Sequence, residues 1–289
     1  MDLASRPAPW LLLLGAPLAL AAAAPSDGRI VAQPLRPGAT VQVSASSDMA
    51  IRVDVRLGGR KVKELEFPGH LSLTCAASVA SADEGGCTAG RLVFGRAREV
   101  ELDSFGGKAT PRTPDYSGAT YDVARADSGF SMKGARGRLS PREAEVATAL
   151  ADATLGLPPL GALLDGRAFR KGERIEVPVE VGRKVLGFLF SDAELESLTL
   201  GFDGERREAG AEATAFEATA TLNANGGDPS LRVVIKVAGD ILVAKSTGLV
   251  LAVRMAGPVT MAGAIEDDGR KLDLSGNGTW KVAYTAKPQ

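Results

Sequence analysis

Hydrophobic and polar residues alternate with a period of two over most of the chain. In residues 51–57 the apolar positions are Ile51, Val53, Val55 and Leu57, and charged residues stand between them. Such alternation is typical of a strand with one buried face and one solvated face. The pair Gly58-Gly59 then provides a two-residue hairpin turn. The first half of the chain is therefore predicted to form antiparallel hairpins.

Alternation of period two returns after Phe169 and continues to the carboxyl terminus. The run 175–181 contains Pro178, which predicts an edge strand or a bulge because proline cannot donate to a ladder. Later strands are separated by short turn-forming segments, and this spacing favours a meander over a parallel sheet with crossover helices. The predicted reversals lie at Gly239-Asp240, Ser246-Thr247-Gly248, Asp267-Asp268-Gly269 and Gly276-Asn277-Gly278.

One segment between these two regions has helical periodicity. Ser140, Pro141 and Glu143 match a capping box with proline at the first helical position. Val146, Leu150, Ala153 and Leu157 then follow at helical spacing, and Pro158-Pro159 ends the segment before a second short apolar piece that runs to Leu164. The sequence thus predicts a helical insert at about 140–164.

The predicted fold is mainly β, with antiparallel meander sheets that form a curved sheet or half-barrel in two halves. The expected divisions are a signal peptide at 1–24, an amino-terminal β half at 25–138, the helical insert at 139–166 and a carboxyl-terminal β-meander half at 167–289. Whether the halves form one sheet or two domains is left open by the pattern.

The amino terminus resembles a secretory signal peptide. A short region with Arg6 precedes an apolar run of about fourteen residues and an alanine tract. Spanning a bilayer as a helix takes about twenty residues, which favours cleavage near Ala22 to Ala24 over a retained anchor. We therefore expect a periplasmic or extracellular protein of a bacterial type, with no transmembrane span in the mature chain.

Charge and size exclude some classes of function. The chain has 34 basic and 35 acidic residues and a formal net charge of -1, so no strong field would attract nucleic acid. The roughly 265 residues left after cleavage are enough to bury one large core or two small ones.

The two cysteines, Cys75 and Cys87, flank a polar stretch that contains Gly85-Gly86. In an exported protein a pair at this spacing is typical of a disulfide, here across the neck of a hairpin. The spacing does not match the Cys-x-x-Cys of redox-active pairs.

No sequence motif indicates an enzyme. His70 is the only histidine, too few for a histidine-based metal site or an evident triad, and the hydrolase and nucleotide-binding motifs are absent from the sequence. Two carboxylates without histidine would suffice for an acid-pair hydrolase, but aromatic residues, which bind sugars, make up only 5%. Asp267-Asp268-Gly269 lacks the ligand spacing of a calcium loop. We expect no cofactor, no metal site and no catalytic residues.

The signal peptide, the antiparallel meander, the helical insert and the closing series from Gly239-Asp240 to Gly276-Asn277-Gly278 resemble secreted envelope proteins of the lipoprotein-carrier-like kind. The likeness is one of layout. In that group a curved sheet forms an incomplete barrel whose apolar concave face, covered by helices, accepts acyl chains. The resemblance implies an apolar ligand cavity lined by Val146, Leu150, Leu157, Ile235, Leu251, Val253 and Trp280.

Two hypotheses therefore stand together. One is an exported, non-enzymatic carrier or binder of an apolar ligand such as a lipid. The other is a structural or protein-interaction module of the cell envelope with a filled core and an envelope protein partner. Buried strands and lipid-facing strands have the same alternation, so the pattern favours neither.

Overall fold

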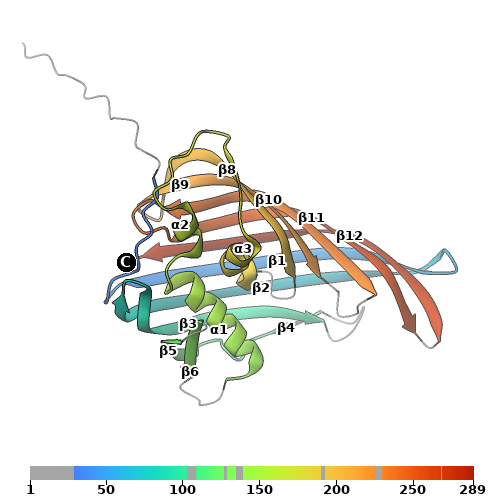
Figure 1. Ribbon diagram of the computed structural model, residues 1–289. Helices are drawn as coiled ribbons and strands as arrows, with labels where there is room; N and C mark the ends of the chain where they lie inside the picture. The colour runs from blue at the N-terminus through green and yellow to red at the C-terminus, as the bar shows by residue number, and fades with distance from the viewer. Residues whose placement is uncertain are drawn as a thin grey trace, which may run out of the picture.

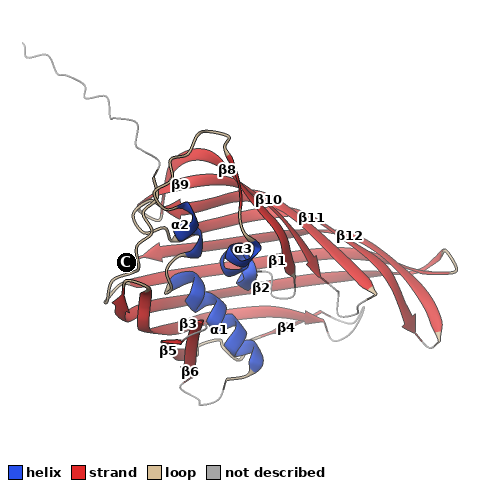
Figure 2. Ribbon diagram, viewed as in Figure 1, coloured by secondary structure: helices blue, strands red, loops and turns tan. Residues whose placement is uncertain are grey.

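The structure is a computed structural model that describes residues 29–102, 109–126, 129–134, 139–189, 193–224, 230–267 and 269–289. The predicted signal peptide lies outside these residues. Within them the fold is mainly β, as the alternation predicted, and Figures 1 and 2 show one long curved sheet with a few short helices on one side.

Twelve described strands form a single antiparallel sheet. Eleven of them follow one another in the order β6-β5-β3-β2-β1-β12-β11-β10-β9-β8-β7, and β4 pairs with β3. The strands are β1 (Thr40–Leu57), β2 (Arg60–Asp83), β3 (Gly86–Leu102), β4 (Ala109–Arg112), β5 (Thr120–Ala126), β6 (Gly129–Gly134), β7 (Arg174–Glu176), β8 (Glu194–Glu208), β9 (Ala211–Ala224), β10 (Leu231–Ala244), β11 (Val250–Asp267) and β12 (Arg270–Pro288).

The two predicted β halves meet in the middle of this sheet. Strand β1 pairs with β12 from Val41↔Pro288 to Arg56↔Asp273. Along the path the outermost strands are β6 and β7, so the sheet stays open and does not close into a barrel. The halves therefore contribute to one sheet.

The helical insert forms as predicted. Helix α1 (Pro141–Thr154) begins at a capping box, in which the Glu143 N–H donates to Ser140 Oγ at 3.2 Å and the Ser140 N–H donates to Glu143 Oε2 at 2.8 Å. Helix α2 (Pro159–Leu164) follows Pro158. No described helix is both long enough and apolar enough to cross a membrane.

The predicted strand at 175–181 is wrong beyond its first residues. Strand β7 covers only Arg174–Glu176, and Val179–Leu186 forms helix α3, followed by the 3-10 turn η1 (Gly187–Leu189). Pro178 stands just before α3. Glu180 lies in the first turn and Arg183 and Lys184 in the last, an arrangement that complements the helix dipole. The apolar run at 175–181 is too short to distinguish the strand period of two from the helical period of 3.6.

Two of the predicted reversals are also wrong. Gly239 lies inside β10, and Gly276 and Gly278 lie inside β12. A Cβ on Gly239 would approach the Arg254 carbonyl oxygen to 1.9 Å, and one on Gly278 would approach the Ala50 carbonyl oxygen to 2.0 Å. These glycines permit close backbone contact between strands. In the sequence they look the same as glycines that form turns.

Candidate functional site: the inner face of the sheet

The inner face is the side of the sheet that the helices cover, and pairing across strands defines its rows. Tyr284 of β12 lines one gap together with Pro158, Pro159 and Val185 of the helical region, which places the even positions of β12 on this face. Paired residues of antiparallel strands share a face. The partners of the even β12 residues on β1 and β11 therefore belong to the inner face, and so do the partners of those residues on β2 and β10.

The end of the inner face beneath the helices is tightly filled. Leu150, Leu251 and Val253 are 0% exposed. The gap lined by Ala153, Pro158, Pro159, Lys184, Val185, Val250 and Tyr284 has a volume of about 10 Å³. A single water needs about that much space, so this gap cannot hold an acyl chain.

The seven residues predicted to line an apolar cavity do not share one environment. Val146, Leu150, Ile235, Leu251 and Val253 belong to one buried cluster, whereas Leu157, beyond the end of α1, is 36% exposed. Trp280 is partly buried, and its Nε1–H donates to Ser47 Oγ at 2.6 Å.

The predicted disulfide between Cys75 and Cys87 is wrong, because both cysteines are free thiols. The hairpin is tight, so Cys87 pairs near the turn with Ala82, while Cys75 pairs with Phe94 farther along. Seven residues of strand separate Phe94 from Cys87, about 20 Å, and a disulfide requires Cα atoms within about 7 Å. Burial raises the pKa of Cys75 to about 12 and also raises that of Cys87, which makes both thiols unreactive.

The inner face continues beyond the helices, where β1, β2, β11 and β12 project as a long extension (Figure 1). From Gly257 to Asp267 strand β11 covers about 30 Å. We call the following three rows the distal inner face: Phe67, Ile51, Gly278, Val259, Ile235; Leu65, Val53, Gly276, Met261, Val233; and Lys63, Val55, Leu274, Gly263, Leu231.

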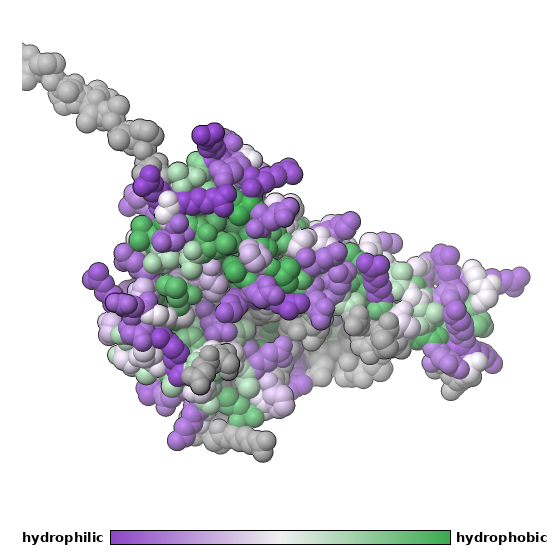
Figure 3. Space-filling view, in the orientation of Figure 1, coloured by the Kyte–Doolittle hydropathy of each residue, from purple (hydrophilic) through white to green (hydrophobic). Residues whose placement is uncertain are grey.

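Fourteen of these fifteen positions are apolar or glycine, and Lys63 is the only charged one. The central side chains, such as Val53 and Val259, are fully buried, whereas Phe67 is partly exposed. Met49 and Trp280, in the adjoining row, are also partly exposed. At the tip Leu57 is 38% and Val62 56% exposed, and Figure 3 shows hydrophobic residues among charged ones along this extension.

Ion pairs occupy many carboxylates on the opposite, outer face. Lys61 Nζ lies 2.6 Å from Asp54 Oδ1, and this contact lowers the pKa of Asp54. Arg125, which has the parity of the buried Tyr121 and Val123 on β5 and so does not belong to the outer face, has Nη1 2.8 Å from Asp83 Oδ1 and lowers the pKa of Asp83 in the same way. His70 Nδ1 contacts Asp48 Oδ1 at 2.6 Å across paired strands. These groups serve as solvated cross-strand pairs.

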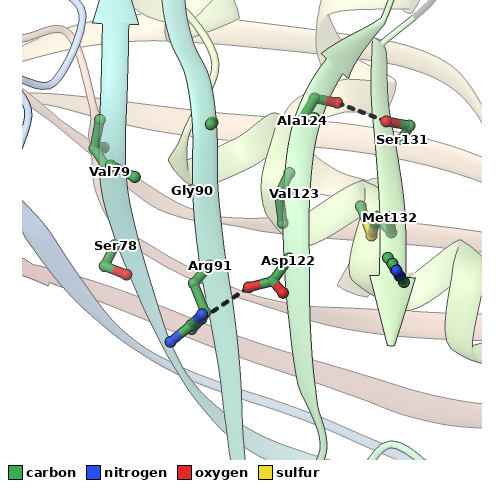
Figure 4. Close-up of a pocket in the computed structure, with 12 residues that line it drawn as sticks. Ser78, Val79, Gly90, Arg91, Asp122, Val123, Ala124, Ser131 and Met132 are labelled. Atoms are coloured by element: carbon green, nitrogen blue, oxygen red, sulfur yellow. Dashed lines mark hydrogen bonds and ion pairs between the residues drawn. The ribbon is translucent and has the colours of Figure 1, made fainter. Parts of the chain in front are cut away.

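Sequence reasoning missed a hollow of about 650 Å³ on the strands β2, β3, β5 and β6 (Figure 4). One row of paired residues crosses it: Ser78, Arg91, Asp122 and Lys133. Arg91 Nε donates to Asp122 Oδ1 at 2.9 Å, and Ser131 Oγ donates to the Ala124 carbonyl oxygen at 3.1 Å. The pairing of β2 with β3 shifts register beside this hollow, after Val79. The pattern of residues in the sequence did not predict these shifts.

Among the described residues no group of three or more His, Cys, Asp or Glu side chains is arranged to hold a metal ion.

No known protein family and no curated protein matches the sequence.

Solved structures give only distant likenesses. A structure on lipid-protein interactions in lipovitellin aligns at 9% identity and a TM-score of 0.41, covering 88% of this chain and 26% of that one. The outer-membrane protease OmpT from Escherichia coli aligns at 9% identity and TM-score 0.17, covering 88% of this chain and 97% of that one. The outer-membrane protein OprG from Pseudomonas aeruginosa aligns at 5% and 0.12, covering 89% and 99%. At these TM-scores we draw no argument from the likenesses.

Proposed function

We propose that the chain is an exported, non-enzymatic protein that binds an apolar ligand such as a lipid on its distal inner face. The observation that carries the proposal is the length of this apolar surface. It continues over five strands beyond the three short helices, and although its inner rows are buried, Phe67 and, at the tip, Leu57 and Val62 remain exposed in part. Exposed apolar side chains gathered on one part of a protein commonly mark a binding site.

Three large side chains of this surface and its adjoining row are partly exposed: Phe67, Met49 and Trp280. Met49 pairs with Gly69 and Trp280 with Gly257, positions that carry no side chain of their own. An apolar chain lying along this band would bury these three side chains without displacing the filled core beneath the helices.

Two measurements test the proposal: the lipid content of the purified protein and its binding of a fluorescent probe. Protein purified from its own envelope should carry lipid in native mass spectrometry, and the delipidated protein should bind a fluorescent fatty-acid analogue. Phe67→Ser should raise the dissociation constant about tenfold, because it removes apolar contact area. Val93→Ser removes an exposed aliphatic side chain from another strand, β3, and should leave binding unchanged. Absence of both lipid and probe binding would refute the proposal.

A second candidate is a structural or protein-interaction module with a filled core. It is favoured by the gap of about 10 Å³ beneath the helices and by the complete burial of Leu150, Leu251 and Val253. It predicts no lipid in the purified protein and a specific envelope protein recovered by crosslinking, whereas the carrier predicts lipid with no obligatory partner.

A further inference from the structure

Strand β6 (Gly129–Gly134) is an outermost strand of the sheet, and part of its backbone points away from β5. Just before β5, the Ala119 carbonyl oxygen accepts from the Phe94 N–H at 2.8 Å, so the odd positions of this segment bond to β3 and the even ones to β6. Phe130 and Met132 lie opposite odd β5 residues. Their N–H and C=O groups therefore point outward, and in the described part of the chain no other backbone group bonds to them.

The charged row that leads to this edge alternates in sign from strand to strand. Arg91 of β3 pairs with Asp122 of β5, and Asp122 pairs with Lys133 of β6. Arg91 Nε donates to Asp122 Oδ1 at 2.9 Å, so that carboxylate already has a partner. Lys133 is exposed. Opposite charges on neighbouring strands stabilise their pairing and like charges oppose it, so the next strand in this row would carry an acidic residue opposite Lys133.

The two faces beside the edge differ in character. On the inner face Phe130 and Met132 are partly buried against the core, and helix α1 packs over β6 (Figure 1). A carboxylate of this helix, Asp152, lies 3.9 Å from the position of a Cβ on Gly129. An apolar residue therefore suits the inner face of an added strand better than an acidic one.

On the outer face the hollow of about 650 Å³ extends to the edge. Ser131, Met132 and Lys133 of β6 line it together with residues of β2, β3 and β5 (Figure 4). This open space beside Ser131 and Lys133 leaves room for polar side chains from a strand that lies along β6.

We propose that β6 is the docking site of an extended segment of a partner protein, which joins the sheet as an antiparallel strand. The segment has an acidic residue opposite Lys133, a small polar residue opposite Ser131 and aliphatic residues opposite Phe130 and Met132. The outward backbone groups of Phe130 and Met132 supply hydrogen bonds, and Lys133 selects the charge. This edge is separate from the distal inner face, so the inference does not depend on an apolar ligand.

The probe is a fluorescein-labelled peptide, acetyl-Glu-Val-Thr-Val-Thr, which places its Glu opposite Lys133 and its two valines opposite Met132 and Phe130. Fluorescence polarisation with the full chain should show saturable binding. N-methylation of the first valine removes an N–H that faces Met132 and should weaken binding about tenfold, through the lost hydrogen bond and a clash. N-methylation of the central threonine is the matched control, because that N–H faces away from β6, and it should leave binding unchanged.

A charge exchange tests the role of Lys133. A peptide with Lys in place of Glu should bind wild-type protein about fivefold more weakly, and Lys133→Glu should reverse this preference. Lys236→Glu, at an exposed position of β10, should not change it. The inference is overturned if the peptide does not bind, if the two N-methylated peptides bind equally, or if Lys133→Glu leaves the preference unchanged. Self-association of the chain that the peptide fails to dissociate would assign the edge to a second copy and also overturn it.

Discussion

At the scale of single residues, the glycines inside the strands set how closely the backbones approach. Gly278 pairs with Ile51 on one side and Val259 on the other, and a Cβ there would lie 2.0 Å from the Ala50 carbonyl oxygen. The strands must separate to accept any side chain at this position. The sequence showed the glycines but not the contact, because both turns and close strand contacts select glycine.

Gly278→Ala should lower the free energy of unfolding by at least about 2 kcal/mol, as overpacking against backbone does. Gly187→Ala is the control, since no atom lies within 4 Å of a Cβ there and its φ of -55° suits alanine. Urea unfolding of both variants measures the difference. Equal stability of the two variants would contradict the close strand contact.

The thiols provide a direct check on the absent disulfide. Protein purified without reductant and then denatured should react with two equivalents of Ellman's reagent, because Cys75 and Cys87 are free. The folded protein should react slowly, since both are buried. A count of zero thiols after denaturation would show that the cysteines are bridged.

Burial of Cys75 also predicts a dependence of stability on pH. The folded pKa is raised to about 12 from an ordinary value of 9.0. The unfolded thiol therefore ionises first, and the stabilisation present below pH 9 is lost as pH rises toward 12. At pH 11 wild type should have lost about 2 kcal/mol more than Cys75→Ala, relative to pH 8. Parallel pH profiles of the two proteins would contradict this burial.

At the scale of elements, helix α1 was predictable because its first residues form a recognisable cap. Helix α3 was not predicted because it lacks such a cap. Ser140, Pro141 and Glu143 each have a defined role at a helix start, and the hydrogen bonds occur as expected. Helix α3 has eight residues and no side-chain cap, so only its charges and spacing distinguish it from a strand. Strand identity was correct for most of the chain because alternation persisted over many residues.

Ser140→Ala should lower the free energy of unfolding by about 1 kcal/mol, since it removes the acceptor for the Glu143 N–H. Ser246→Ala, in the exposed turn between β10 and β11, should change it by less than about 0.5 kcal/mol. Chemical denaturation of both variants is the measurement. Equal effects would show that the cap contributes nothing specific to α1.

At the scale of the whole molecule, the union of two halves into one sheet was not predictable. It depends on β1 pairing with β12, residues more than 200 positions apart, and nothing in local alternation specifies that partner. Of the candidate site, the sequence predicted only that its residues are apolar. The apolar parity of Ile51, Val53 and Ile235 was evident, but the filled end beneath the helices and the projecting end beyond them required the fold.

One buried cluster runs beneath the helices and continues along the projecting end. The projecting end differs in that Met49, Phe67 and Trp280 remain partly exposed there. We propose that an apolar chain lies on this projecting surface.

Photocrosslinking with a fatty acid that carries a diazirine in its chain shows where on the protein an apolar chain binds. After illumination and proteolysis, we expect labelled residues to fall within 49–69 and 257–280, with Met49, Phe67 and Trp280 among them, and excess palmitate should suppress the labelling. Crosslinks confined to the outer hollow around Arg91 and Lys133, or labelling that palmitate does not suppress, would contradict it.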